Sequence, residues 1–235
     1  MPAVIPRLVV VPGLGLDGRS WSRLRRRVPA DVVLLPGMGR SAPVPSVDDL
    51  AAGLRARLGA GPVVLAGHSQ GCQVVAAAAV DPRVAGVVLL GPSTDPRVRR
   101  PATLAWWWLR TALREPWWQV PLVLAQWLTT GPRAMRALWR SAAPDRVDER
   151  LRAVGVPVTV VRGTRDRLCP ADWAAAVAAA APQGRLVEVA GAAHLTVQTH
   201  PDAVADVLRA VAGEVTRPGG AAPLQGRGGG PPVTP

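Results

Sequence analysis

A serine between glycines is the residue of this 235-residue chain that most clearly suggests chemistry. Ser69 lies in the stretch Gly67-His68-Ser69-Gln70-Gly71, which fits the pattern Gly-x-Ser-x-Gly. An apolar run, residues 63–66, precedes the stretch, and an alanine-rich segment, residues 73–80, follows it. A strand, a sharp turn and a helix form the context that exposes a serine hydroxyl for attack, and small flanking residues leave room for the neighbouring chain. The sequence therefore predicts Ser69 as a nucleophile.

A histidine should accompany Ser69, because a serine hydroxyl is a weak nucleophile until a base accepts its proton. His194 follows the last predicted strand, in a loop that would lie at the carboxyl edge of a sheet, and we predict it as the base. His200 stands directly before Pro201 and fits the start of a helix better, although it stays open as the alternative base. His68 should point away from Ser69 and serve packing and hydrogen bonding.

A carboxylate is needed in turn, to fix the tautomer of the histidine and to stabilise its charged form. Asp166 follows the predicted strand at residues 156–161, and we predict it as this acid. Two alternatives stay open. Asp166 could be a surface turn carboxylate between Arg165 and Arg167, and Asp95, which follows the predicted strand at residues 84–90, could reach the histidine instead.

Short apolar runs alternate with helical segments along the chain, as expected when parallel strands are covered by helices on both faces. The predicted strands are residues 8–11, 32–35, 63–66, 84–90, 156–161 and 185–189. The predicted helices are residues 20–27, 47–58, 70–80, 171–181 and 201–211. This order predicts an α/β fold with a mostly parallel central sheet of about six strands, flanked by helices and wound with right-handed crossovers.

Residues 92–150 interrupt this alternation, since they show no strand signal and hold seven of the nine tryptophans. We predict a helical, tryptophan-rich cap in residues 92–150, with the core in residues 1–91 and 151–216. Residues 217–235 are rich in Gly and Pro, which predicts a disordered tail. An ordinary helix pair packed on the core, or a helix that touches lipid, would also explain the tryptophan-rich segment. Charges and prolines interrupt it too often for a membrane span.

Three further motifs make the chain resemble the α/β-hydrolase superfamily. Val11-Pro12-Gly13-Leu14-Gly15 resembles the loop after the first central strand of that family, Pro36-Gly37-Met38-Gly39-Arg40-Ser41 resembles its Pro-Gly-x-Gly-x-Ser turn, and Gly163-Thr164-Arg165-Asp166 resembles its acid turn. The resemblance implies a Ser69-Asp166-His194 triad, in the chain order of the family. It also implies an oxyanion hole made of the backbone amides of Leu14 and Gln70.

One departure from the family pattern concerns the oxyanion loop. Many members begin this loop with His-Gly, whereas the present chain has Pro12-Gly13, so a side-chain donor is lost. The backbone amides should still be presented, because Gly13 and Gly15 permit the turn.

The activity that the resemblance implies is that of a carboxylesterase-like serine hydrolase. Such an enzyme would cleave the ester of a small, largely apolar substrate through an acyl-enzyme on Ser69, and thioesters and lactones also remain open. A cofactor-free perhydrolase or haloperoxidase would use the same three residues, with peroxide in place of water. A hydrolase-fold protein that binds a small ligand without turnover is the third possibility.

A formal charge of +12 would ordinarily suggest a nucleic-acid partner. All 28 basic residues are arginines, most of them are scattered, and no nucleic-acid-binding motif accompanies them, so we expect no such partner. Cys72 and Cys169 form neither a disulfide framework nor a metal-ligand pattern, and we expect no cofactor and no metal. Residues 1–11 do not read as a signal peptide, so we expect a cytoplasmic protein without an integral membrane span. Nothing in the sequence indicates the oligomeric state.

Overall fold

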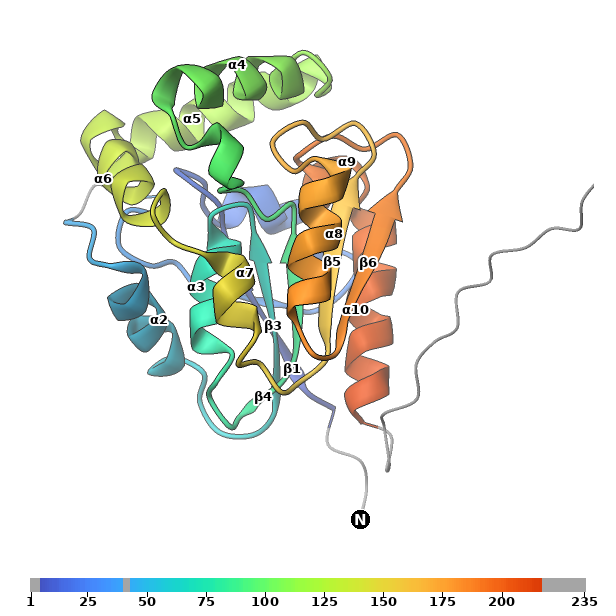
Figure 1. The fold of residues 1–235 in the computed structure, drawn as a ribbon. Coiled ribbons are helices and arrows are strands. Elements are labelled where there is room, and N and C mark those ends of the chain that lie inside the picture. Colours follow the sequence, from blue (N-terminus) through green and yellow to red (C-terminus); the bar gives the residue numbers. More distant parts are fainter. Residues whose placement is uncertain (1–4, 40–42, 217–235) are drawn as a thin grey trace, which may run out of the picture.

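The centre of the molecule is a six-stranded sheet with the order β2-β1-β3-β4-β5-β6, in which every neighbouring pair is parallel (Figure 1). This computed structural model describes residues 5–39 and 43–216. The strands are β1 (Arg7–Val11), β2 (Asp31–Val32), β3 (Val63–His68), β4 (Val84–Leu90), β5 (Val158–Gly163) and β6 (Gly184–Val189). The predicted α/β fold is confirmed. Because the strands are parallel, their carboxyl ends share one edge, where ligands bind in open α/β sheets.

Apolar residues alternate between the two faces of the sheet, and helices cover both faces. In β3, Val63 and Leu65 belong to the core on one face, whereas Val64 and Ala66 belong to the core on the other. The first face is covered by α2 (Val47–Arg55), α3 (Gly71–Ala78), α7 (Val147–Leu151) and α8 (Ala171–Ala180), and the second by α1 (Ser22–Arg25), α9 (Thr196–Thr199) and α10 (Pro201–Val215). Close packing on both faces makes the sheet a stiff frame for the loops at its edge.

One predicted strand is shorter than the sequence suggests. The apolar run at residues 32–35 contributes only β2, because the chain leaves the sheet edge after Val32 pairs with Val10. Leu35 is fully buried in the core instead of extending the strand. The backbone then turns through Gly37, whose φ is +84°. An apolar run of this length can fill a core from a loop as well as from a strand, so its composition alone does not fix its conformation.

One predicted helix is divided. The segment at residues 20–27 forms a 3-10 turn (Gly18–Trp21) followed by α1, which ends at Arg25. The Asp17 side chain accepts a hydrogen bond from the Arg19 amide and so caps the turn. The other predicted strands and helices are present, with ends that differ by a few residues.

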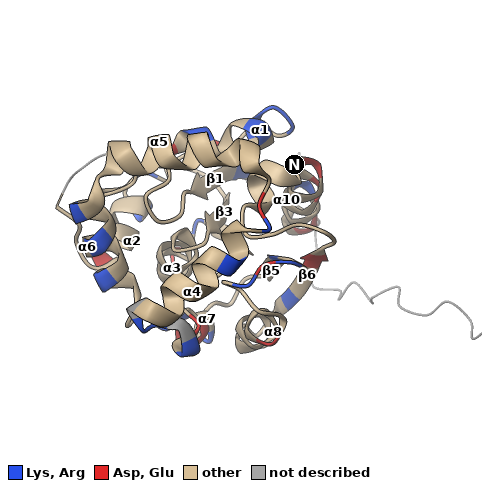
Figure 2. Cartoon of the chain, turned by 90° about the horizontal axis from the view of Figure 1, so that it is seen from above, with Lys and Arg blue, Asp and Glu red and all other residues tan. Residues whose placement is uncertain are grey.

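The segment between β4 and β5 forms the predicted helical insertion, which lies above the carboxyl edge of the sheet (Figures 1 and 2). Its helices are α4 (Pro101–Ala112), a 3-10 turn (Trp117–Gln119), α5 (Val120–Thr130) and α6 (Pro132–Ala142). We call α4, this turn, α5 and α6 the cap. The later helix α7, which also falls within residues 92–150, packs with α3 and α8, and its Val147 and Leu151 are buried in the core.

Within residues 5–39 and 43–216, no helix is both long and apolar enough to cross a membrane. Both cysteines are free and buried. The predicted tail at residues 217–235 and residues 40–41 of the Pro-Gly-x-Gly-x-Ser turn lie outside the described residues.

Candidate active site

Ser69 occupies a sharp turn between β3 and α3. Its φ of +52° lies in the left-handed region, which is costly for a residue with a side chain and is maintained only where the surroundings enforce it. The Ser69 amide donates to the Leu90 carbonyl at the end of β4, at 2.8 Å, which ties the turn to the neighbouring strand. A Cβ added to Gly67 would lie 2.5 Å from the Gly71 carbonyl oxygen, so the turn requires this glycine. The strand, turn and helix around Ser69 form as the sequence predicts.

The loop after β1 packs directly on this turn. A Cβ added to Gly71 would lie 2.6 Å from the carbonyl oxygens of Val11 and Pro12. A Cβ added to Gly13 would lie 3.0 Å from the Cβ of Ser69. The glycines of both segments therefore allow the two backbones to approach within contact distance.

The amides predicted to form an oxyanion hole belong to these two segments. Leu14 lies in a turn that is closed by a 3.0 Å hydrogen bond from the Leu16 amide to the Gly13 carbonyl. Gln70 lies at the start of α3, directly after the serine. In the part of the chain that the structure describes, the backbone amides of Leu14 and Gln70 donate no hydrogen bond to protein atoms. Such amides can stabilise negative charge on a substrate oxygen, and this role stays a prediction.

His194 and Asp166 are joined by a 2.7 Å hydrogen bond between Nδ1 and Oδ2. His194 lies in the loop after β6 and Asp166 in the turn after β5. The other oxygen of Asp166 accepts the amides of Leu168 and Cys169, at 2.8 and 3.1 Å. Because the carboxylate accepts a hydrogen bond from Nδ1–H, the neutral ring keeps its proton on Nδ1 and carries its free lone pair on Nε2. This is the tautomer that a general base beside a serine requires.

A glycine at the end of β4 makes room for this pair. Gly91 has a φ of +56°, and a Cβ there would lie 3.1 Å from Nδ1 of His194 and 3.2 Å from Oδ2 of Asp166. The neighbouring Leu90 accepts the Ser69 amide. The carboxyl ends of β3, β5 and β6, with Gly91 at the end of β4, thus hold Ser69, Asp166 and His194 at one edge of the sheet, and their catalytic roles stay predictions.

The hydroxyl of Ser69 donates to Ser93 Oγ at 3.3 Å, and within the described residues no hydrogen bond joins it to His194. Ser93 lies in the loop after β4 and is 8% exposed. The predicted pairing with His194 would require the Ser69 hydroxyl to leave Ser93, and hydrogen bonds between catalytic groups often form only with substrate bound. Sequence reasoning missed Ser93, and the only signal for it was its position at the carboxyl end of a predicted strand.

The two histidines of the site differ in protonation. His68 Nε2 lies 3.0 Å from the His194 carbonyl oxygen. Burial, together with the charge of His194, lowers the pKa of His68 to about 3, so this ring is neutral and donates. Burial also lowers the pKa of His194, but the charge and hydrogen bond of Asp166, with a further contribution from Glu115, more than offset this effect and raise it above its ordinary value. Of these two rings, His194 is therefore the one that is more easily protonated.

The alternative acid and base have structural contacts of their own. Asp95 caps a short 3-10 turn by accepting the Arg97 amide at 2.8 Å, and its carboxylate pairs with the Arg97 guanidinium. His200 stands at the start of α10, and its ring lies 2.9 Å from the Thr199 hydroxyl. The carboxylate that contacts His194 is that of Asp166.

Each of the four loops around Ser69 is joined to the cap by a hydrogen bond. These bonds link Thr130 Oγ1 to the Gly15 carbonyl (3.0 Å), Gln70 Nε2 to the Leu138 carbonyl (3.3 Å), the Arg167 amide to Thr111 Oγ1 (3.2 Å) and the Leu195 amide to Glu115 Oε1 (2.7 Å). A Cβ on Gly15 would also lie 2.9 Å from the Trp127 ring and 3.2 Å from the Met135 side chain. The cap is therefore in direct contact with the site.

Glu115 is a second carboxylate near His194 that sequence reasoning missed. It lies between α4 and the 3-10 turn of the cap, and besides Leu195 it accepts the side-chain amide of Gln119 at 3.1 Å. Burial raises the pKa of Glu115, and its charge in turn raises the pKa of His194. No sequence pattern marks this contact, because 79 residues separate Glu115 from His194 and only the fold of the cap brings them together.

Two surface cavities lie away from these residues. One, of about 870 Å³, lies between α2 and α6, and the other, of about 590 Å³, lies between β1 and α10. Neither cavity is lined by Ser69, Asp166 or His194. The candidate site is therefore identified by its side chains and their contacts, and not by the size of a cavity. In residues 5–39 and 43–216 no three His, Cys, Asp or Glu side chains are grouped as metal ligands would be.

Comparison with known proteins identifies the family. The model of the alpha/beta hydrolase family matches residues 8–207. The chain belongs to the alpha/beta hydrolase family. The resemblance inferred from the motifs around Leu14, Gly37, Ser69 and Asp166 is thus confirmed. Among curated protein sequences, none matches significantly.

Solved structures of similar shape include hydrolases of this fold. A thermophilic esterase from Thermogutta terrifontis is 25% identical, with a TM-score of 0.70, over 90% of this chain and 91% of the esterase. MenH from S. aureus is 16% identical, with a TM-score of 0.75, over 91% and 96% of the two chains. Est816, described as an N-acyl homoserine lactone degrading enzyme, is 18% identical, with a TM-score of 0.72, over 87% and 92%. At these low identities, the similarity to MenH and to Est816 shows a shared fold and nothing more.

Proposed function

We propose that this alpha/beta hydrolase is a serine hydrolase that cleaves carboxylic esters through an acyl-enzyme on Ser69. The observation that carries the proposal is the 2.7 Å hydrogen bond between His194 and Asp166, placed beside a serine with a φ of +52°. A buried carboxylate that fixes the tautomer of a histidine next to a strained serine is the arrangement that activates a serine hydroxyl. The burial of Asp166, 1% exposed, keeps this arrangement rigid.

In the first half of the reaction, the Ser69 hydroxyl turns from Ser93 toward Nε2 of His194. His194 accepts the proton while the serine oxygen forms a bond to the carbonyl carbon of the ester. The carbonyl oxygen becomes negative and is stabilised by the amides of Leu14 and Gln70. The imidazolium, stabilised by Asp166, then donates its proton to the departing alcohol as the ester bond breaks.

In the second half, a water molecule takes the place of the alcohol. His194 removes one proton from the water, whose oxygen attacks the acyl carbon. The second tetrahedral intermediate collapses, the acid is released, and the proton returns to Ser69. Cys72 and Cys169 take no part as nucleophiles, because burial raises the pKa of both thiols well above the ordinary value.

Two observations support an ester with a small apolar acyl group. The structure of the Thermogutta terrifontis esterase aligns along 90% of this chain at 25% identity. The cap places the side chains of Trp127 and Met135 against Gly15, next to the predicted oxyanion loop. Apolar side chains at that position favour an apolar acyl group through burial of its surface.

Steady-state hydrolysis of a series of p-nitrophenyl esters tests the proposal. Wild type should hydrolyse short esters, and Ser69→Ala and His194→Ala should each reduce kcat by roughly 10⁴-fold or more. A thioester, a lactone and a peroxide-dependent halogenation assay should be run beside it. Turnover in the halogenation assay with no ester cleavage would overturn the ester assignment, and ester cleavage undiminished in Ser69→Ala would overturn the mechanism.

A further inference from the structure

The surface of the cap is unusually apolar. Among the described residues, ten large hydrophobic side chains are exposed, and eight of them lie between residues 106 and 128. They are Trp106, Trp108, Leu109, Leu113, Trp117, Val120, Leu124 and Leu128. Single exposed hydrophobic side chains are ordinary on a protein surface, whereas a concentration of them marks an interaction site.

The exposed side chains follow the helical repeat, so they form continuous stripes. On α4, Trp106 and Leu109 are about half exposed, and the series continues to Leu113 after the helix, which is 78% exposed. On α5, Val120, Leu124 and Leu128 recur at every fourth residue, and Leu128 is 83% exposed. Outward positions on a helix that packs on a core are normally polar, so both helices present an apolar face that residues 5–39 and 43–216 leave uncovered.

The two stripes belong to one surface. The Trp108 ring on α4 lies 5.2 Å from the Trp127 ring on α5, centroid to centroid, which joins the two helices. Trp117, 82% exposed, lies in the 3-10 turn that connects them. Both helices lie above the carboxyl ends of the central strands, on the side of the molecule opposite the amino ends of those strands (Figure 1). We call the eight exposed side chains between residues 106 and 128 the outer cap face.

The charge around the outer cap face has a single sign. Residues 101–142, which form the cap, contain five arginines and one acidic residue, Glu115. Glu115 is turned toward the core, where it accepts the Leu195 amide. The Arg110 guanidinium lies 5.7 Å from the ring centres of Trp106 and Trp107, so a positive charge stands among the apolar side chains.

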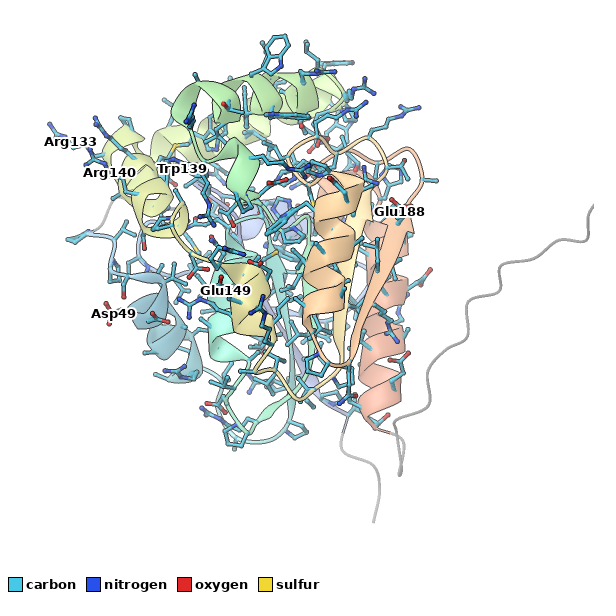
Figure 3. All side chains as sticks on the ribbon, viewed as in Figure 1. Asp49, Arg133, Trp139, Arg140, Glu149 and Glu188 are labelled. Carbon is cyan, nitrogen blue, oxygen red and sulfur yellow. The ribbon has the colours of Figure 1, made fainter. Side chains whose placement is uncertain are left out.

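A row of arginines on α6 adds positive charge to the cap, on the side that faces the cavity between α2 and α6. Arg133, Arg136 and Arg140 are exposed at positions that share one side of the helix, and α6 carries blue bands of basic residues in the view from above (Figure 2). Arg133 and Arg140 project away from the sheet (Figure 3). The combination of tryptophan, leucine and arginine, with no exposed carboxylate, is complementary to a surface that is apolar inside and negative outside.

The geometry points to the occupant: we propose that the outer cap face docks on the surface of a membrane that contains anionic lipids. A second copy of the chain fits less well, because a symmetric pairing would bring two sets of arginines together without a carboxylate between them. The helices would lie on the membrane, since at about 1.5 Å per residue neither α4 nor α5 approaches the length of a span. Indole rings and leucines would enter the headgroup region while arginines contact phosphate groups.

Vesicle flotation with the full chain tests the proposal, using two kinds of vesicle. One kind is phosphatidylcholine alone, and in the other about a third of the lipid is phosphatidylglycerol. Wild type should float with the anionic vesicles, much less with the neutral ones, and high salt should release it. Binding needs no chemistry at the site, so Ser69→Ala should float as wild type does, whatever becomes of the proposed ester hydrolysis.

Two sets of variants locate the contact. Combined Leu113→Ser, Trp117→Ser and Leu128→Ser should weaken binding by about tenfold or more, because three inserted apolar side chains are lost. The matched control is Ile5→Ser with Val80→Ser, at the two exposed hydrophobic positions outside the cap, and should bind as wild type does. Arg110→Gln with Arg114→Gln should reduce binding to anionic vesicles specifically.

Several outcomes would overturn the proposal. These are no flotation of wild type with anionic vesicles, equal flotation with neutral ones, or unchanged flotation of the triple variant. Sedimentation velocity tests whether a second copy of the chain occupies the outer cap face instead. If wild type is a dimer, the triple variant is a monomer and neither binds vesicles, the outer cap face is a dimer interface. Because all three positions are exposed, the variants should keep the thermal unfolding midpoint of wild type, and this measurement shows that they are folded.

Discussion

The proposed role of His194 as a base depends on Asp166, which accepts a hydrogen bond from the other ring nitrogen. The hydrogen bond of 2.7 Å and the burial of Asp166 hold the ring in that tautomer. Asp95 is equally buried, yet its carboxylate pairs with Arg97. The two carboxylates are therefore distinguished by the side chains that they contact, and not by how deeply they are buried.

The first prediction compares these two acids. Asp166→Asn should reduce kcat by about 10⁴-fold, because the amide favours the wrong tautomer of His194. Asp95→Asn should keep most of the activity, since its contacts lie with Arg97. Steady-state kinetics on a short ester would measure both. Full activity in Asp166→Asn together with a large loss in Asp95→Asn would show that the acid is Asp95.

The second prediction concerns pH. The charge of Glu115 raises the pKa of His194, so Glu115→Gln should lower that pKa. His194 must be neutral to act as a base, so kcat/KM declines as the pH falls through its pKa, and the variant should retain activity to lower pH than wild type. Glutamine keeps an oxygen for the Leu195 amide. Glu149→Gln, in an exposed ion pair on α7, is the control and should leave the profile in place. If the low-pH decline of kcat/KM moved to higher pH in Glu115→Gln, this account would be contradicted.

The positions of Ser69, Asp166 and His194 at the carboxyl edge of the sheet could be predicted from sequence, because each residue lies in a short motif that follows a strand. Ser93 and Glu115 could not. Their proximity to Ser69 and His194 comes from the packing of the loop after β4 and of the cap, and neither residue lies in a pattern that names a role.

At the scale of elements, the strands at the centre of the sheet could be predicted and the connections at its edge could not. β3, β4 and β5 are apolar throughout because helices cover both faces, which leaves a strong signal. The run at residues 32–35 has the same composition, but Leu35 fills the core from a loop. In the cap, helix formation is local, whereas the way that α6 packs on the core depends on tertiary contacts.

The third prediction concerns the attachment of α6. Leu138 is fully buried, belongs to the main core, and lies against Gly37. Leu138→Ala should lower the free energy of unfolding by about 2–5 kcal/mol, through lost burial and the remaining cavity. Leu128→Ala, at an 83% exposed position of α5, is the matched control and should change stability by less than about 0.5 kcal/mol. Urea denaturation would measure both, and equal values would contradict the inferred anchoring of α6.

For the whole molecule, the main consequence of the fold is that the cap and the catalytic loops form one unit. All four loops around Ser69 are joined to the cap, which carries the apolar side chains nearest the oxyanion loop. The cap therefore contacts the candidate site directly, and in the proposed function it also shapes the space for substrate. The outer face of the same helices carries the exposed tryptophans. Substitutions on the inner and on the outer side of the cap can therefore be compared for their effect on activity.

The fourth prediction uses this difference between the two sides. Trp127→Leu should open space beside Gly15 and shift the preference between a butyrate and an octanoate ester toward the longer chain, by about tenfold in the ratio of kcat/KM values. Trp106→Leu, on the outer face, should leave the ratio unchanged. Kinetics with the two esters would measure the ratio. The same shift in both variants would mean that the indole near Gly15 does not set acyl preference.

Covalent labelling with a fluorophosphonate, followed by intact-mass and peptide mass spectrometry, tests the central claim most directly. Wild type should gain one adduct per chain on the peptide that contains Ser69, because the hydroxyl activated by His194 attacks phosphorus as it would a carbonyl carbon. Ser69→Ala should gain none, and Ser93→Ala should still be labelled at Ser69. An adduct that persists in Ser69→Ala, or no adduct on folded wild type, would contradict the assignment of Ser69 as the nucleophile.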